Sequence, residues 1–185
     1  MELYGKKVKL RAIELEDIEI LRCMKNDPWT ESMVVGWCPP ISKRQQEKWF
    51  ESLSLNKDSM LFMIETEEDG TVGYTCLVNI DWKNRSANGG IMLSNKKNMS
   101  KGIATDTYMT LLRYAFLELN LHRVNGAILD YNKASQKFSI EKVGSHKEGI
   151  KRQAIYKNGE YHDLVLIGIL KEDYIKKIEE TGYWD

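Results

Sequence analysis

The chain has 185 residues, of which 42% are hydrophobic, and 27 Lys and Arg residues balance 27 Asp and Glu residues. This length supports one sizeable hydrophobic core and is too short for two ordinary domains, so we expect residues 1–185 to form a single domain. The formal net charge of zero provides no overall attraction for nucleic acid or an anionic membrane, which argues against a DNA-binding or RNA-binding protein.

The three cysteines, Cys23, Cys38 and Cys76, have neither the spacing of a metal site nor that of a disulfide framework. The first residues lack the apolar core of a signal peptide, and no run approaches the roughly 18 apolar residues of a membrane span. We therefore expect a soluble protein of the reducing cytoplasm that holds no metal.

The N-terminal half predicts two helices and an antiparallel strand pair. Ser42 is suited to cap the second helix, and Asp69-Gly70 is a strong signal for a hairpin turn. The segment 29–40 holds two Trp and two Pro residues without a clean period, so we expect an irregular wall of a binding site, or aromatic side chains packed on the core. Hydrophobic patterns predict strands at 8–13, 60–65 and 72–82, and helices at 16–26 and 43–55.

The C-terminal half predicts a strand, helix, strand unit followed by a helix and a hairpin. An apolar stripe from Tyr108 to Leu119 recurs with the period of an α-helix, and Asn158-Gly159 marks a hairpin turn. The helix between strands 89–93 and 123–129 predicts a right-handed crossover between parallel strands. Further patterns predict a helix at 133–143 that ends at Gly144, strands at 150–156 and 161–170, and a terminal turn or helix after 171.

The segment 98–105, between strand 89–93 and the stripe helix, is suited to bind an anion. A glycine turn before a helix leaves backbone N–H groups without partners, and the helix dipole adds positive potential there. Lys96, Lys97 and Lys101 add three cations, which favours a ligand with several phosphates. A polar surface turn with solvated lysines is the alternative.

The chain resembles the GNAT superfamily of acetyl-CoA-dependent N-acetyltransferases in the order of its elements and in this loop. The family's pyrophosphate loop reads Gln/Arg-x-x-Gly-x-Gly/Ala, and this sequence matches it at Gly102 and Ala104 but has Met99 at the first position. The resemblance implies the GNAT fold, an α+β or α/β architecture. Its sheet is mixed, mostly antiparallel and twisted, with a central βαβ crossover and flanking helices.

Within this superfamily the sequence is most similar to the branch that acetylates ribosomal-protein N-termini, whose relatives act on polyamines, amino sugars and antibiotics. The opening Leu10-Arg11, the helix start Asn132-Lys133-Ala134-Ser135 and the helix end Glu141-Lys142-Val143-Gly144 resemble its motifs. The hairpin at 157–163 completes a resemblance that covers nearly the whole chain.

The resemblance implies direct transfer of the acetyl group from acetyl-CoA to a primary amine in a ternary complex. A backbone N–H in a bulged strand 91–93 would bind the oxyanion, and Ser135 would donate to the departing sulfur unless it only caps its helix. The family's glutamate before the loop is absent here, so the base is Asp81 acting through water, or a relay to bulk water. The implied cofactor-binding residues are Ile91, Met92, Leu93, Met99, Ser100, Lys101, Gly102, Ile103, Ala104, Thr105, Asn132 and Lys137.

The missing glutamate and Met99 leave one rival from another class, a non-catalytic acyl-CoA-binding or regulatory module on the same fold. A P-loop enzyme is disfavoured because no Gly-Lys-Ser/Thr sequence is present. We expect Cys76 to be a core residue, His122 and His162 to be structural, and the acceptor pocket to lack an unambiguous charge cluster. Edge strands of such folds often pair two chains, so a homodimer is one expected assembly.

Overall fold

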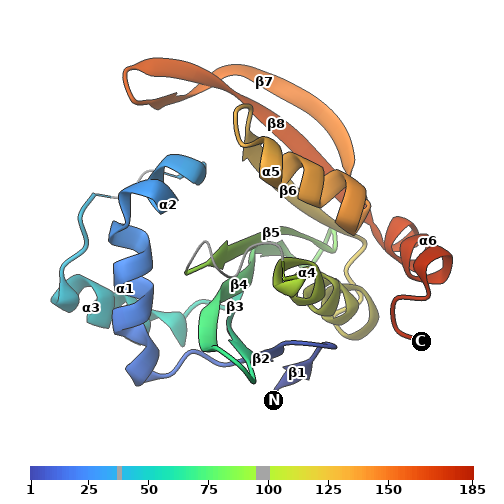
Figure 1. The fold of residues 1–185 in the computed structure, drawn as a ribbon, viewed down its shortest axis with the longest axis horizontal. Helices are drawn as coiled ribbons and strands as arrows, with labels where there is room; N and C mark the ends of the chain where they lie inside the picture. Colours follow the sequence, from blue (N-terminus) through green and yellow to red (C-terminus); the bar gives the residue numbers. More distant parts are fainter. Residues whose placement is uncertain (37–38, 95–100) are drawn as a thin grey trace.

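The computed structural model describes residues 1–36, 39–94 and 101–185, and Figure 1 shows their arrangement. Eight strands form one sheet in the order β1-β2-β3-β4-β5-β6-β8-β7. Neighbouring strands are antiparallel except β5 and β6, which are parallel, so the expected mixed sheet is confirmed. The strands are β1 Leu3–Tyr4, β2 Lys9–Arg11, β3 Ser59–Thr66, β4 Gly70–Asp81, β5 Ser86–Leu93, β6 Arg123–Leu129, β7 His146–Lys157 and β8 Glu160–Leu170.

Helices precede β3, cross from β5 to β6, and follow β6 and β8. They are α1 Ile18–Asn26, α2 Pro28–Met33, α3 Lys43–Leu53, α4 Ile103–Arg113, α5 Lys133–Lys137 and α6 Lys171–Thr181. α4 and α5 each continue into a π-helical turn, at Tyr114–Glu118 and Phe138–Val143. No helix among the described residues combines the length and the apolar character that crossing a bilayer requires.

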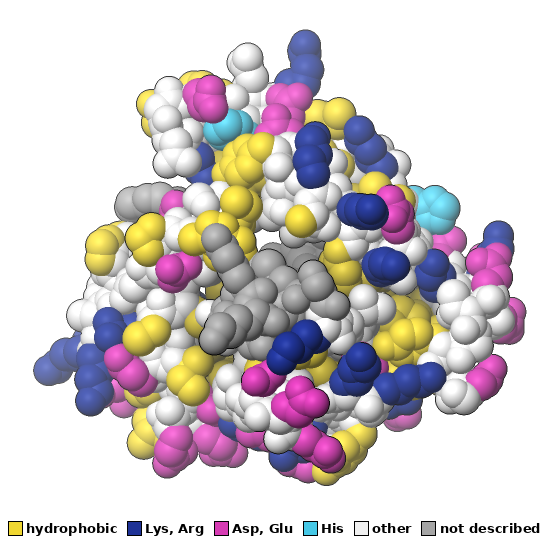
Figure 2. Space-filling model, viewed as in Figure 1, with side chains coloured by type: hydrophobic (Ala, Val, Ile, Leu, Met, Phe, Trp, Pro, Cys, Tyr) yellow, Lys and Arg dark blue, Asp and Glu magenta, His cyan; other side chains and the backbone are white. Residues whose placement is uncertain are grey.

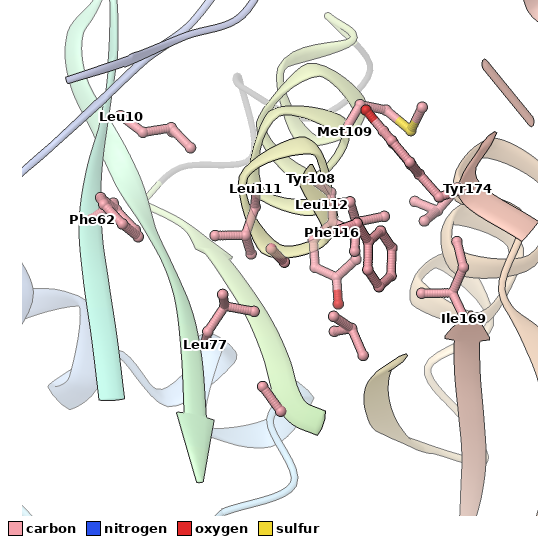
Figure 3. Close-up of a cluster of buried hydrophobic side chains, with 14 of the residues drawn as sticks. Leu10, Phe62, Leu77, Tyr108, Met109, Leu111, Leu112, Phe116, Ile169 and Tyr174 are labelled. Carbon is pink, nitrogen blue, oxygen red and sulfur yellow. The ribbon is translucent and has the colours of Figure 1, made fainter. Parts of the chain in front are cut away.

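The core has two layers because successive strand residues point to opposite faces of the sheet. Phe62 and Ile64 of β3 join the large cluster beneath α4, whereas Met63 between them joins a second cluster beneath α1 and α3. Figure 3 shows the stripe of α4, including Leu111 and Leu112, against strand residues of the first cluster. The predicted stripe helix is therefore the central packing element.

Local signals account for most element ends. Ser42 caps α3 and accepts a hydrogen bond from the Gln45 N–H at 3.3 Å. The hairpin residue Asn158 has a φ of 52° and Gly159 a φ of 92°, as a type I′ turn requires. Gly144 ends the helical segment with a φ of 91°.

Two expectations were wrong. Residues 28–33 form α2 rather than irregular chain, because Asp27 accepts a hydrogen bond from the Thr30 N–H at 2.7 Å and Pro28 occupies the first helical turn. The register shift of the β4–β5 pair lies between Val78 and Asp81, and pairing is continuous from Asn88 to Leu93. Strand 91–93 therefore carries no bulge, and its neighbouring glycines instead permit close approach of other atoms.

Candidate functional site

The parallel strands β5 and β6 pair over a short length and then separate. Their pairing covers Ser86 to Asn88 on β5 and Arg123 to Asn125 on β6. Beyond these residues β5 pairs only with β4, and β6 only with β8, within the described chain. Figure 1 shows the two strands diverging. The unpaired edges of this β5–β6 wedge offer backbone N–H and C=O groups to an extended ligand that carries amides.

The closed end of the wedge is filled by an aromatic pair. Tyr108 of α4 is 7% exposed, and its ring packs edge-on against Phe138 with the centroids 6.0 Å apart. A Cβ atom at Gly89 would overlap with the Tyr108 hydroxyl oxygen and lie 2.8 Å from Val124 Cγ1. Gly89 is therefore required by the close approach of this hydroxyl to the backbone of β5.

The open end of the wedge faces the N-terminus of α4. Gly102 precedes the helix with a φ of 81°, and its carbonyl accepts the Asp106 N–H at 3.0 Å. The N–H groups of Ile103, Ala104 and Thr105 precede this first helical hydrogen bond and are available to an anion. Predicted contacts Met99 and Ser100, like Lys96 and Lys97, lie outside the described residues.

Lys7 adds a cation at this helix N-terminus, and sequence reasoning missed it. Its Nζ donates to the Lys101 carbonyl at 3.0 Å and lies 3.5 Å from the position of a Cβ on Gly102. A cation at the positive end of a helix dipole is unfavourable unless an anion joins it. Lys101 itself pairs with Asp69 at 2.8 Å, which raises the pKa of Lys101. In Figure 2, Lys and Arg side chains lie beside the start of α4, and Asp and Glu side chains lie below it.

Asp106 holds the segment that carries Lys7. This carboxylate is 2% exposed and accepts the backbone N–H groups of Lys6, Lys7 and Val8 at 2.9, 2.6 and 3.0 Å. Tyr183 near the C-terminus donates to the same carboxylate at 2.9 Å. The position of Lys7 is therefore set by a buried acceptor on α4.

Asn132 and Ser135 lie where β6 leads into α5. The Asn132 side-chain oxygen accepts the Ser135 N–H at 3.1 Å, and its amide donates to the Met33 carbonyl of α2 at 3.1 Å. Asn132 therefore caps α5 and ties it to α2. The Ser135 hydroxyl makes no hydrogen bond to the described residues, so it can donate to a ligand.

Asp81 and Lys137 each contact a residue close to them in the sequence. Asp81 pairs with Ser86 at the start of β5, three residues before Gly89, and its two oxygens accept from Asn84 at 2.8 and 2.6 Å. The Asn84 backbone and side-chain hydrogen bonds lower the pKa of Asp81, which is the opposite of what a base near neutral pH needs. The exposed Lys137 extends toward Glu141, with Nζ 4.0 Å from the carboxylate.

The end of α2 is held by three donors that the sequence did not reveal. Lys157 at the β7–β8 turn is 6% exposed, and its Nζ donates to the Glu31 carbonyl, the Glu31 carboxylate and the Gly36 carbonyl at 2.7, 2.5 and 3.2 Å. Tyr131 donates to the Ser32 carbonyl, and the Asn132 side-chain amide donates to the Met33 carbonyl. These bonds fasten the expected acceptor wall to the hairpin and to the start of α5.

The cysteine and histidine residues offer no metal site within the described chain. Burial raises the pKa of the Cys76 thiol to about 11, so the thiol is protonated at neutral pH. His162 packs edge-on against Tyr131 with the ring centroids 4.7 Å apart, and its Nδ1 lies 3.7 Å from the Asp130 carboxylate.

Comparisons with known proteins agree with this architecture. The family model of the acetyltransferase (GNAT) domain matches residues 7–146. The N-acetyltransferase p20 of Bacillus licheniformis is 30% identical over 175 residues, which cover 93% of this chain and 97% of that protein. YdaF of Bacillus subtilis, provisionally named a ribosomal N-acetyltransferase, is 37% identical over 107 residues, 57% of each chain.

A solved structure has a similar fold. The spermidine N-acetyltransferase of Vibrio cholerae, in complex with CoA and spermine, aligns with a TM-score of 0.84 and 23% identity. The alignment covers 92% of this chain and 99% of that chain. At this identity the likeness concerns the fold.

Proposed function

The chain belongs to the acetyltransferase (GNAT) family and is an acetyl-CoA-dependent N-acetyltransferase, and we propose that the β5–β6 wedge binds its cosubstrate. The observation that carries this proposal is the separation of the two parallel strands after Asn88 and Asn125, with the N-terminus of α4 at the open end. Residues 1–185 would form one domain around this wedge.

In the proposed complex the pyrophosphate of CoA lies against Lys101, Gly102 and the first N–H groups of α4. The pantetheine arm follows the edge of β5 from Leu93 through Ile91, and its amides pair with backbone groups there. Asn132 borders the arm from the β6 side, and Ser135 donates to the departing sulfur. These roles are supported by the free strand edge and by the unpartnered Ser135 hydroxyl.

The acetyl group passes directly from sulfur to the amine. Cys76 does not serve as an acyl carrier in this proposal, because a thiol with a pKa of about 11 is a poor nucleophile at neutral pH. The amine loses its proton to water, since the Asp81 carboxylate already accepts two hydrogen bonds from Asn84 in the turn after β4. An acetylated Cys76 in a mass spectrum of the turning-over enzyme would contradict direct transfer.

The acceptor is a primary amine bound between α2, α3 and the open wedge. The motif Asn132 to Ser135 favours the branch that acetylates protein N-termini, while the fold likeness to a spermidine acetyltransferase keeps polyamines in the same class of acceptor. A cytoplasmic location and reduced Cys23 and Cys76 thiols fit either acceptor.

Thiol release from acetyl-CoA tests the proposal. Purified protein is incubated with acetyl-CoA and a panel of N-terminal peptides, polyamines, amino sugars and aminoglycosides, and free CoA is measured. We expect amine-dependent release with at least one class. Tight CoA binding without release across the panel would instead indicate a non-catalytic acyl-CoA-binding module.

We also propose that two copies associate through the edge strand β7. This strand has one unpaired side at the end of the sheet, and Tyr156 on it is 62% exposed. Light scattering coupled to size-exclusion chromatography is expected to give twice the 21.5 kDa chain mass. A monomeric mass at all concentrations would contradict this association.

A further inference from the structure

The Tyr108 hydroxyl lies where β5 and β6 separate, and none of the roles described above uses it. The backbone of β5 passes directly over this hydroxyl at Gly89, because a Cβ there would overlap with the oxygen. Gly89 is the first residue of β5 after the parallel pairing ends at Asn88. The hydroxyl therefore marks the closed end of the wedge.

The Tyr108 side chain is 7% exposed, and its hydroxyl makes no hydrogen bond to the described residues. A hydroxyl that lies at Gly89, where the wedge closes, and has no acceptor among the described residues can donate to a bound ligand. Burial raises the pKa of Tyr108 far above its ordinary value, so the group remains a neutral O–H donor throughout the physiological range. The geometry thus supplies a preorganised donor that lacks an acceptor.

The dimensions of the wedge indicate what that acceptor is. At about 3.3 Å per residue, β5 extends roughly 13 Å from Leu93 back to Gly89. A CoA molecule whose pyrophosphate lies at Gly102 and whose pantetheine arm follows this edge brings its thioester toward the closed end. The thioester carbonyl then lies beside Gly89 and the Tyr108 hydroxyl.

We propose that Tyr108 is a catalytic residue whose hydroxyl donates a hydrogen bond to the thioester carbonyl oxygen. Together with a backbone N–H of the β5 edge it forms an oxyanion hole. This inference rests on the proposed binding of acetyl-CoA in the wedge.

The reaction step is balanced without proton transfer from Tyr108. The amine lone pair forms the new C–N bond, and the carbonyl π pair moves to the oxygen, whose negative charge the Tyr108 O–H stabilises. When that pair returns, the C–S bond breaks and its electrons leave with the sulfur. The amine proton passes to water, and the sulfur gains a proton, so the products are an acetamide and free CoA.

Tyr108→Phe removes only the hydroxyl oxygen and tests this role. We expect kcat to fall about 100-fold, which is the lower end of the effect of deleting one oxyanion-hole donor. The KM for acetyl-CoA and the Kd for CoA, which has no thioester carbonyl, should stay within about twofold of wild type, because only the transition-state interaction is lost. The matched control is Tyr114→Phe, on the π-helical turn after α4, with its ring edge-on to Phe62.

Thermal unfolding separates a catalytic role from a structural one. Tyr108→Phe should leave the midpoint of unfolding nearly unchanged, since it keeps the ring and removes a hydroxyl that bonds to no described residue. Unchanged kcat, or a joint loss of kcat and thermal stability, would overturn the role of Tyr108. Wild-type protein that releases no thiol with any amine would instead contradict the proposed function itself.

Discussion

Single residues decide whether this site can hold an anion and an amine. Gly102 is required by its left-handed φ of 81° at the start of α4. Lys157 is required by three acceptors at the end of α2 that would otherwise be unpaired. Each residue can therefore be tested by a substitution that changes one property.

Gly102→Asp should weaken acetyl-CoA binding about 10-fold or more. Two like charges a few ångströms apart near a protein surface repel by about 1 to 4 kcal/mol, and the new carboxylate would face the phosphates. Gly102→Asn is the matched control, because Asn has the same shape, no charge and tolerance of the left-handed region. Isothermal titration calorimetry measures both, and equal losses would attribute the effect to backbone strain.

Lys157→Met should raise the KM for the acceptor amine about 10-fold and leave the KM for acetyl-CoA nearly unchanged. The substitution frees the end of α2, whereas the wedge lies on other elements. It also leaves the Glu31 carboxylate, whose side chain is 31% exposed, without its cation. Lys151→Met, on an exposed position of β7, is the control. A larger change in the acetyl-CoA KM than in the amine KM would contradict this role.

At the scale of elements, α4 joins the packing of the core to the chemistry of the wedge. Its apolar stripe fills the core, its N-terminus faces the open end, and Tyr108 reaches the closed end. The N-terminal segment adds Lys7 to the same helix end. A cavity of about 990 Å³ lies between this segment, the β3–β4 turn and Lys101.

Lys7→Gln should raise the Kd for CoA about fivefold and reduce the salt dependence of binding. The substitution removes a cation that the phosphates would otherwise neutralise, and the backbone N–H that binds Asp106 remains. Lys6→Gln is the control, because its Nζ donates instead to the Asp185 carbonyl at 3.3 Å. Equal effects of the two substitutions would indicate a general charge effect rather than a contact.

The turn before α1 is tied to the sheet by a buried ion pair. Arg11 of β2 donates to the Asp17 carboxylate at 2.6 and 2.9 Å and to Glu65 of β3 at 2.6 Å. Burial acts to raise the pKa of Asp17, but hydrogen bonds from Arg11 and the Glu14 N–H outweigh it and lower the pKa below 3.8. The stabilisation is therefore present above about pH 4 and is lost as the pH falls through the lowered native pKa.

Asp17→Asn should lower the free energy of unfolding by about 3 kcal/mol at neutral pH, because it leaves the Arg11 charge without its main partner. Urea titrations across pH 2 to 7 measure this. The difference from wild type should shrink at the acid end of the range. Glu19→Gln, in an exposed pair with Arg22, should change little, and a difference that stays constant down to pH 2 would contradict the ion-pair account.

At the scale of the whole molecule, the two ends of the chain meet at α4. Asp106 accepts three N–H groups from residues 6–8 and the Tyr183 hydroxyl. A Cβ at Gly5 would overlap with the same carboxylate. The first strands, the crossover helix and the C-terminal turn are thus joined at one buried group.

Asp106→Asn should destabilise the protein by about 3 kcal/mol, because its NH2 group would face donors instead of accepting from them. At this chain length that corresponds to a fall of about 6 to 12 °C in the unfolding midpoint, measured by calorimetry. Asp69→Asn, in the exposed pair with Lys101, should shift the midpoint little. Similar shifts for both variants would show that Asp106 does not join the chain ends.

The sequence by itself determined the features that depend on neighbours along the chain. The stripe of α4, the limits of β6, the cap at Ser42 and the turn at Asn158-Gly159 follow from periodicity and turn chemistry. The crossover between parallel strands and the glycine before α4 could also be predicted, since both are local patterns. Asp27-Pro28 was also a local signal for the start of α2. The aromatic residues after it lack a helical period, so the segment was interpreted as irregular.

Only the tertiary structure decided which distant groups meet. The helical period of the apolar residues predicts that Tyr108 faces the core. Only the packing of α4 on β5 and β6 places its hydroxyl next to Gly89. Lys157 and Asp106 looked like ordinary charged residues, because their partners lie 126 and about 100 residues away along the chain. Such contacts depend on how whole elements pack, and a pattern within one element does not contain that information.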